Sequence, residues 1–269
     1  MIVYPNCKIN LGLNVISKRP DGYHNIESIF YPVPWCDMLE IIPSDKNSFV
    51  FDGISINCPQ SENLCYKAFQ LLKNQYDIPD ISLYLYKKIP FGAGLGGGSS
   101  DGAFTLSALN ELLSLNLDKK TLAQMASCLG SDCAFFAYNQ PGYITGTGTD
   151  ISPLSLTLKG YYIVIIKPDI AVSTKEAYQM IRPKKPDTPL LEIVKRPVSG
   201  WKELLINDFE ESVFLKYPKI RMIKNKLYEN GAVYASMSGS GSAVYGIFTK
   251  DTGIEDGFQN CIVWKGCLS

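Results

Sequence analysis

The hydrophobic positions of the chain predict strand-like runs alternating with helix-like runs. From Lys8 to Val15 apolar residues fill every second position, which is the repeat of a β-strand with one apolar and one polar face. Similar runs predict strands at Met38 to Ile42, Ser48 to Ile56, Ile81 to Ile89 and Tyr161 to Ile166. The segment Val233 to Phe248 is typical of strand, glycine turn and strand.

Four segments repeat apolar residues every three or four positions, which is the spacing of an amphipathic helix. They are Glu62 to Gln75, Ser99 to Leu113, Leu122 to Leu129 and Ile220 to Leu227. Gly130 and Gly231 follow the last two segments in the usual position of a helix stop. Ser173 and Glu176 form a candidate capping box at a further helix start.

The order of these elements predicts an α+β protein of two domains, residues 1–152 and 153–269, with substrates bound between them. The turn-rich segment Pro141 to Pro153 marks the boundary. Pro183 to Pro197 is rich in proline and lysine and is predicted to be a surface loop, whose role the sequence leaves open.

Composition narrows the class of protein. The chain has 269 residues, 46% hydrophobic and 19% charged, which is typical of a globular protein and excludes a disordered one. Basic and acidic residues both number 26, so no net positive charge favours nucleic-acid binding. The apolar runs are too short to span a bilayer, and the N-terminus lacks the pattern of a secretory signal. We therefore expect a cytoplasmic protein that binds neither membrane nor nucleic acid.

The eight cysteines form no C-x-x-C pair, and only one histidine is present, so the sequence predicts no structural metal site. We expect reduced thiols in the hydrophobic core. Cys128 and Cys133 stand in apolar segments, where a reduced cysteine behaves as a small hydrophobic residue.

A glycine-rich segment, Pro90 to Ser100, carries the strongest chemical signal. It holds five glycines within seven positions, between a predicted strand and a predicted helix. Glycine permits positive φ and close approach of a ligand to the backbone. Exposed amides at a helix start bind anions, and phosphate is the natural ligand of such a loop. A flexible linker is the plainer alternative, but an ordinary turn seldom needs so many glycines.

Two well-known phosphate loops fit less well. A Walker A loop would need a lysine where Gly98 stands. Gly92, Gly94 and Gly97 satisfy G-x-G-x-x-G, but the β-α-β setting of a dinucleotide-binding fold is absent, so an oxidoreductase remains a minor alternative.

Three ordered motifs resemble those of the GHMP kinases, the superfamily of galactokinase, homoserine kinase and mevalonate kinase. They are the loop P-F-G-A-G-L-G-G-G-S-S-D from Pro90, the segment Met237 to Ser242, and the N-terminal segment Pro5 to Leu13. The resemblance implies an N-terminal domain like ribosomal protein S5 domain 2 and a ferredoxin-like C-terminal domain. It also implies an ATP-dependent small-molecule kinase that phosphorylates an alcohol.

Four local signatures resemble the branch of the superfamily that acts on a cytidine-diphosphate-linked methylerythritol. They are Cys7 to Leu11, Asp21 to His24, Glu62 to Leu64 and Leu129 to Asp132. The resemblance implies transfer of the γ-phosphate of ATP to the 2-hydroxyl of that substrate, in the non-mevalonate isoprenoid pathway. The alternatives are another GHMP kinase, acting on homoserine or mevalonate, and a phosphate-binding regulatory or scaffold protein without turnover.

The resemblance assigns roles to residues that the plain pattern leaves ambiguous. Lys8 and Asn10 share the polar face of the first strand, where solvated polarity is the plainer explanation. By resemblance, Lys8 lies beside the catalytic carboxylate and Asn10 contacts the substrate. Asp132 fits a helix cap, and by resemblance it accepts the proton of the substrate hydroxyl.

The resemblance further implies a cytidine site at Tyr23 and His24, with Tyr178 as a second aromatic residue against the base, although each fits an ordinary turn or helix position. It implies that Asn63, otherwise a helix cap, lies near the adenine. The nucleotide-binding residues are then Asn63, Pro90, Phe91, Gly92, Ala93, Gly94, Leu95, Gly96, Gly97, Gly98, Ser99 and Ser100. ATP and Mg²⁺ are the expected cofactors, with Ser99 or Ser100 as candidate magnesium ligands. The oligomeric state, monomer or homodimer, is open.

Overall fold

A computed structural model describes residues 1–55 and 58–268 of the chain. The chain packs into two compact units that are built from interleaved segments. Unit 1 comprises Met1–Cys7, Trp35–Phe91 and Gly96–Gln140, and unit 2 comprises Lys8–Pro34, Gly92–Leu95 and Pro141–Ser269. Division into domains at residues 152 and 153 stays a prediction.

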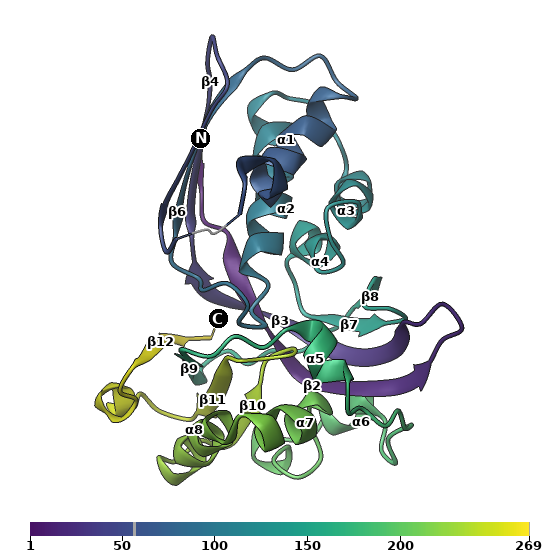
Figure 1. Cartoon of the computed structure of the whole chain (residues 1–269), viewed down its shortest axis with the longest axis vertical. Helices are drawn as coiled ribbons and strands as arrows, with labels where there is room; N and C mark the ends of the chain where they lie inside the picture. The colour runs from purple at the N-terminus through teal and green to yellow at the C-terminus, as the bar shows by residue number, and fades with distance from the viewer. Residues whose placement is uncertain (56–57, 269) are drawn as a thin grey trace. The chain divides into compact units, whose positions relative to one another are not determined.

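Unit 1 combines a mixed sheet with four helices. Its strands are β1 (Ile2–Val3), β4 (Met38–Pro43), β5 (Ser48–Gly53) and β6 (Ile81–Lys87), in the order β1-β4-β6-β5. Only the β5–β6 pair is parallel among these pairings. The helices are α1 (Leu64–Lys73), α2 (Gly97–Leu112), α3 (Lys119–Ser127) and α4 (Cys133–Tyr138). Helix α2 packs against α1, α3, α4 and β4, as Figure 1 shows. These contacts therefore fix the position of α2, which begins directly after the glycine loop, within unit 1.

Unit 2 contains two four-stranded sheets. The first has the order β2-β3-β7-β8 and consists of β2 (Asn6–Lys18), β3 (His24–Cys36), β7 (Gly142–Thr145) and β8 (Asp150–Pro153). The second has the order β10-β11-β9-β12, with antiparallel pairs throughout. Its strands are β9 (Tyr162–Pro168), β10 (Tyr234–Met237), β11 (Val244–Phe248) and β12 (Cys261–Cys267). Strand β2 begins in unit 1 and continues into unit 2, whereas β3 begins in unit 2 and ends in unit 1.

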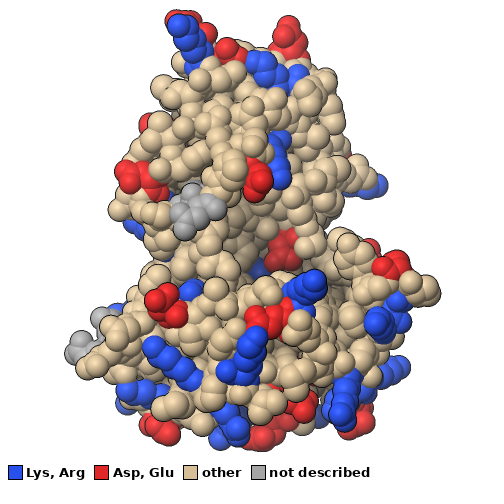
Figure 2. Space-filling view, in the orientation of Figure 1, with Lys and Arg blue, Asp and Glu red and all other residues tan. Residues whose placement is uncertain are grey.

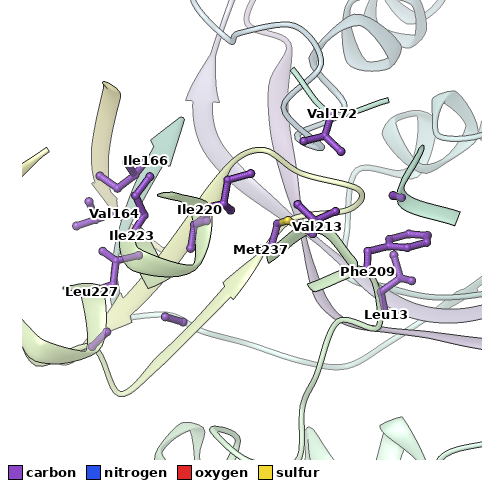
Figure 3. Packing of buried hydrophobic residues seen from close by; sticks show 14 of the residues in the cluster. Leu13, Val164, Ile166, Val172, Phe209, Val213, Ile220, Ile223, Leu227 and Met237 are labelled. Atoms are coloured by element: carbon purple, nitrogen blue, oxygen red, sulfur yellow. The ribbon is translucent and has the colours of Figure 1, made fainter. Parts of the chain in front are cut away.

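The core of unit 2 lies between the second sheet and its helices. The helices are α5 (Thr174–Tyr178), α6 (Leu190–Ile193), α7 (Phe209–Lys216) and α8 (Pro218–Glu229). Helix α8 packs on β10 and β11, and α7 packs on α5 and α8. Ile220, Ile223 and Leu227 share one face of α8 and are buried with Val164 and Ile166 of β9 (Figure 3). Three 3₁₀ turns complete the described elements: η1 (Gln60–Glu62), η2 (Val198–Gly200) and η3 (Ile254–Gly257).

The α+β class and the predicted helices and strands are confirmed. Ser48 to Gly53 forms the expected strand, whereas Ile56, its predicted end, lies outside the described residues. Ser173 Oγ accepts a hydrogen bond from the Glu176 amide, so the predicted helix start and one of the two hydrogen bonds of the capping box are confirmed. Strand β3 was not predicted, because Pro32 and Pro34 interrupt its pattern.

Two predictions about surface exposure are wrong. The segment Pro183 to Pro197 is not only a surface loop, because it contains α6, and Leu190 and Ile193 are buried in unit 2. Cys128 is exposed because it ends α3 on its solvent side, whereas Cys133 is buried as predicted. All eight cysteines are free thiols.

The surface carries charges of both signs. Figure 2 shows lysine and arginine side chains interspersed with aspartate and glutamate on the face drawn. Within the part of the chain that the structure describes, no helix combines the length and the apolar character needed to span a membrane.

Candidate active site

The glycine loop joins β6 to α2, so the strand and helix predicted on either side of it are confirmed. Gly92, Gly94 and Gly96 have φ values of 59°, 73° and 70°, in the left-handed region that favours glycine. Gly96 is the N-cap of α2, and the first turn of this 16-residue helix contains no acidic residue. The free amides of that turn and the positive end of the helix therefore suit an anion.

The tip of the loop is held by the second glycine motif within unit 2. The Ser238 hydroxyl donates a hydrogen bond of 2.8 Å to the Gly94 carbonyl, and the Ala243 amide donates one of 3.1 Å to the Ala93 carbonyl. A Cβ atom on Gly94 would lie only 1.9 Å from the Ser238 carbonyl oxygen. The two glycine-rich segments thus lie in direct backbone contact, and Gly94 is required there for lack of space as well as for its positive φ.

Strand β2 brings Lys8 and Asn10 to the same place. The Lys8 amide donates a hydrogen bond of 2.9 Å to the Leu95 carbonyl at the end of the loop tip. The Lys8 ammonium donates one of 2.5 Å to Asn10 Oδ1 and lies 4.3 Å from the centre of the Phe30 ring. Asn10 Nδ2 donates to Ser28 Oγ at 2.9 Å.

Lys8 and Asn10 are both buried, with exposures of 2% and 1%. Solvated strand polarity is therefore wrong as an explanation of this face. A buried ammonium is costly unless it meets polar partners, and the amide of Asn10 is one such partner. The arrangement buries the Lys8 ammonium in a strand whose backbone is hydrogen-bonded to the phosphate-loop tip.

In unit 1 a buried ion cluster fixes both flanks of the glycine loop. Lys87, at the end of β6, forms ion pairs with Asp37 and, at 2.7 Å, with Asp101 just after the first turn of α2. Asp37 Oδ1 also accepts the amides of Lys88 and Ile89 at 2.5 and 2.8 Å. The cluster therefore ties the strand that enters the loop to the helix that leaves it.

The protonation of this cluster follows from its burial. Burial raises the pKa of Asp101 to about 8, although the nearby Lys87 charge opposes the shift and the Asp37 charge adds to it. For Lys87, burial lowers the pKa, but the charges of Asp101 and Asp37 outweigh it and the net direction is upward. A retained proton on Asp101 balances the charge of one ammonium between two carboxylates.

Lys87 also limits the residue at position 97. Its ammonium would lie 3.0 Å from a Cβ atom on Gly97, and the Ile89 side chain would lie still closer, at 2.8 Å. Gly97 is therefore glycine because of packing against β6, with no positive φ involved.

Asp132 and Asn63 occupy helix starts in unit 1, with different results. Asn63 Oδ1 accepts the Cys65 amide at 2.9 Å, so Asn63 is the N-cap of α1. Asp132 stands at the N-cap position of α4 but makes no capping hydrogen bond with its side chain, and it is partly exposed. The carboxylate of Asp132 is thus not used as a helix cap.

Two of the three residues predicted for the cytidine site, His24 and Tyr178, come together in unit 2. The rings of His24 and Tyr178 stack with centroids 4.7 Å apart and 18° between their planes, and Phe209 meets the Tyr178 ring edge-on. Tyr23 is 67% exposed. Burial, followed by the charge of Lys18, lowers the pKa of His24 and favours its neutral form. A neutral imidazole stacked on a tyrosine ring offers a flat surface for a base.

The serines after the glycines differ in access. Ser100 is fully buried and its hydroxyl has no hydrogen-bond partner among the described residues, whereas Ser99 is only partly buried. Among residues 1–55 and 58–268, no three His, Cys, Asp or Glu side chains cluster so as to hold a metal ion. A magnesium ion here would take most of its oxygen ligands from the nucleotide and from water, as Mg²⁺ commonly does.

Several residues that shape the site were missed from the sequence. Lys87 had a usable signal, because it continues the alternation of Ile81, Leu83 and Leu85 onto the buried face of β6. Ser28 has the same kind of signal in β3. Asn207 had none, because its partners lie far away along the chain.

The fold and the glycine loop define a small-molecule kinase. Residues 63–140 match the GHMP kinases N terminal domain, and residues 193–261 match the GHMP kinases C terminal domain. The chain is 54% identical to the 4-diphosphocytidyl-2-C-methyl-D-erythritol kinase of Parabacteroides distasonis, with 100% of both chains covered. It is 51% identical to the Bacteroides fragilis kinase of the same name, with 93% of each covered.

A solved structure agrees with these relatives. The crystal structure of a 4-(cytidine 5'-diphospho)-2C-methyl-D-erythritol kinase is 31% identical, with a TM-score of 0.85 over 100% of this chain and 99% of the other. The chain belongs to the family of 4-diphosphocytidyl-2-C-methyl-D-erythritol kinases within the GHMP kinases.

Proposed function

We propose that the protein transfers the γ-phosphoryl group of ATP to the 2-hydroxyl of 4-diphosphocytidyl-2-C-methyl-D-erythritol, a step toward isoprenoid precursors in the cytoplasm. The names of the full-length relatives support this substrate. The observation that carries the proposal is the contact of Lys8 with the phosphate-loop tip through the Leu95 carbonyl. It joins a buried cation to a loop suited to phosphates.

The glycine loop and the start of α2 bind the phosphates of ATP through backbone amides. Lys8 stabilises the negative charge that develops during transfer, and Asn10 orients both Lys8 and the acceptor alcohol. The nucleotide's adenine lies near Asn63, whose Oδ1 is taken by the cap of α1 while its amide group is left for the base. When bound, Mg²⁺ neutralises charge on the transferring phosphates.

Asp132 acts as the general base. Its carboxylate accepts the proton of the 2-hydroxyl as that oxygen forms a bond to the γ-phosphorus, and the bond from the γ-phosphorus to the bridging oxygen of ADP breaks. The partial exposure of Asp132 at the start of α4 supports this role, because a general base must be within reach of the substrate. Tyr23, His24 and Tyr178 bind the cytosine, and the close pairing of His24 with Tyr178 supports that site.

An ADP-release assay tests the substrate. The purified protein is given ATP with the cytidylated methylerythritol, homoserine, mevalonate or galactose in parallel. We expect release with the first acceptor only. Preference for another alcohol would replace the proposed substrate, and no release with any acceptor would favour a binding protein without turnover.

Asp132→Asn tests the base. We expect normal folding and normal ATP affinity, with turnover lowered by about 10²- to 10⁴-fold, which is the usual contribution of a positioned acid or base. Asp118→Asn is the matched control, because Asp118 only caps α3 and asparagine caps equally well. Turnover of Asp132→Asn near that of the control would refute the assignment.

A further inference from the structure

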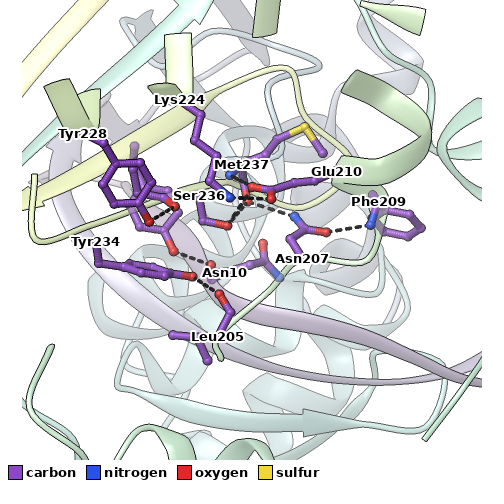
Figure 4. A network of polar contacts seen from close by, with 12 residues as sticks. Asn10, Leu205, Asn207, Phe209, Glu210, Lys224, Tyr228, Tyr234, Ser236 and Met237 are labelled. Carbon is purple, nitrogen blue, oxygen red and sulfur yellow. Dashed lines mark hydrogen bonds and ion pairs between the residues drawn. The ribbon is translucent and has the colours of Figure 1, made fainter. Parts of the chain in front are cut away.

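Asn207, outside every motif described above, contacts the turn Met237–Gly239 at the start of the second glycine motif, and Figure 4 shows it beside Met237. Its Nδ2 group donates hydrogen bonds of 2.8 Å to the carbonyls of both Met237 and Gly239, and its Oδ1 accepts the Phe209 amide at 3.0 Å. The side chain is 2% exposed. Both amide protons are therefore used to hold the two ends of one short turn.

Glu210 holds the same turn from its other side. Its Oε1 accepts the Met237 amide at 2.8 Å and the Ser236 hydroxyl at 3.1 Å, and its Oε2 pairs with Lys224 of α8 at 2.6 Å. Met237 thus has its N–H group bound by Glu210 and its carbonyl bound by Asn207. Two side chains from one segment fix the position and direction of β10 where it enters the turn.

The segment that carries Asn207 is itself fixed to β2. Leu13 donates through its amide to the Ile206 carbonyl at 2.9 Å, and the Asp208 amide donates to the Leu13 carbonyl at 2.8 Å. Strand β2 also carries Lys8 and Asn10. In addition, the Tyr245 hydroxyl of β11 donates to the Asn10 carbonyl at 2.7 Å.

The position of the Met237–Gly239 turn determines where the phosphate-loop tip lies. Ser238, between the two carbonyls that Asn207 holds, donates through its hydroxyl to Gly94. A Cβ atom on Gly239 would lie 3.3 Å from Gly94 Cα, so the turn and the tip are in contact. A shift of the turn would therefore move the tip with it.

We propose that Asn207 is a positioning residue for phosphoryl transfer. It holds the Met237–Gly239 turn in place, and through Ser238 it also holds the phosphate-loop tip. The tip is thereby kept in a fixed position relative to the strand that carries Lys8 and Asn10. Glu210 supports the same turn. The inference rests on the proposed function, since it takes the loop tip to bind the phosphates of ATP. Neither side chain touches substrate in this proposal.

Asn207→Asp is the sharpest test, because it preserves shape and the acceptor for Phe209 while it removes the two donors. We expect ATP affinity, measured by titration with a non-hydrolysable ATP analogue, to fall about 10-fold or more at about pH 8.5, with a fall in kcat of similar size. Burial against two carbonyl oxygens raises the pKa of an aspartate at this position, and a protonated carboxyl can donate one hydrogen bond, so we expect part of the loss to be regained at about pH 6. Asn230→Asp, an exposed amide at the end of α8, is the control and should change neither quantity.

A merely structural role is separated by a double-mutant cycle with Ser238→Ala. If Asn207 acts through Ser238, the double variant loses less ATP affinity than the product of the two single losses. If the two residues act independently, the fold losses multiply. If Asn207→Asp fails to fold, Ser238→Ala alone must weaken ATP affinity. Unchanged affinity in that variant, or multiplying effects with no regain at low pH, would overturn the proposal.

The titration needs no acceptor substrate, so failures of the two proposals are distinguishable. A wild-type protein that binds the ATP analogue but phosphorylates none of the acceptors would refute the proposed substrate, and the effect of Asn207→Asp on binding would still decide the inference. An active wild-type protein with an Asn207→Asp variant of equal affinity and kcat would refute the inference alone.

Discussion

Gly94→Ala tests whether the contact between the phosphate loop and the second glycine turn is needed for nucleotide binding. The new Cβ atom would lie 1.9 Å from the Ser238 carbonyl oxygen, a backbone atom that cannot rotate away. Ordinary contact begins at 3.4 Å, so the two backbone segments would have to separate by about 1.5 Å. A misplacement of about 1 Å can cost about 10²-fold in rate, and we expect kcat/KM for ATP to fall by about 100-fold or more.

Gly92→Ala is the matched control for this change. Gly92 has a φ of 59°, against 73° for Gly94, so alanine pays a similar conformational cost of about 1–2 kcal/mol at both positions. A Cβ atom on Gly92, however, meets no atom within 4 Å. Initial rates at varied ATP and thermal melts of both variants separate the contact from the backbone cost. Equal losses of kcat/KM in the two variants would refute the reasoning.

Two further predictions concern one group in each unit. Asp101→Asn should flatten the pH dependence of stability. In the folded protein the pKa of Asp101 is raised to about 8, whereas the unfolded chain releases this proton near pH 3.8. The free energy of unfolding of the wild type therefore falls as pH rises between these two values, by at most about 1.4 kcal/mol per pH unit. Thermal melts from about pH 5 to about pH 8.5 check this, and equal slopes for variant and wild type would contradict it. Tyr178→Leu removes the ring that stacks on His24 and should raise KM for the cytidylated substrate about 3- to 10-fold with KM for ATP unchanged, as initial rates would measure. Equal shifts in both constants would point to a general disturbance of unit 2 instead.

Local pattern was enough to predict most of the elements. Helix α8 has Ile220, Ile223 and Leu227 on one face, and those residues are buried against the sheet. Strand β2 has its strict alternation, and its polar face proved to be buried beside the loop tip. Pattern failed for β3, because its two prolines resemble a break although the strand continues through them.

The site was predictable where one short segment carries the signal. Five clustered glycines indicated the phosphate loop, and the structure adds that the tip is shaped by a turn far away along the chain. The contacts of Asn207 with Met237 and Gly239 could not be read from the sequence, because spacing along the chain contains no record of which distant segments pack together. The role of Lys87 could have been predicted from the sequence, because its place in the alternation of β6 indicates a buried ammonium that needs carboxylate partners.

The interleaved course of the chain has a consequence for folding during synthesis. Leu13, Val15 and Ile26 are made early, yet they pack in a core whose other members, such as Val244 and Phe258, are made near the end of synthesis. The early strands must therefore wait, with apolar surface uncovered, until almost the whole polypeptide has emerged. We therefore expect the incomplete chain to be more prone to aggregation than the complete one.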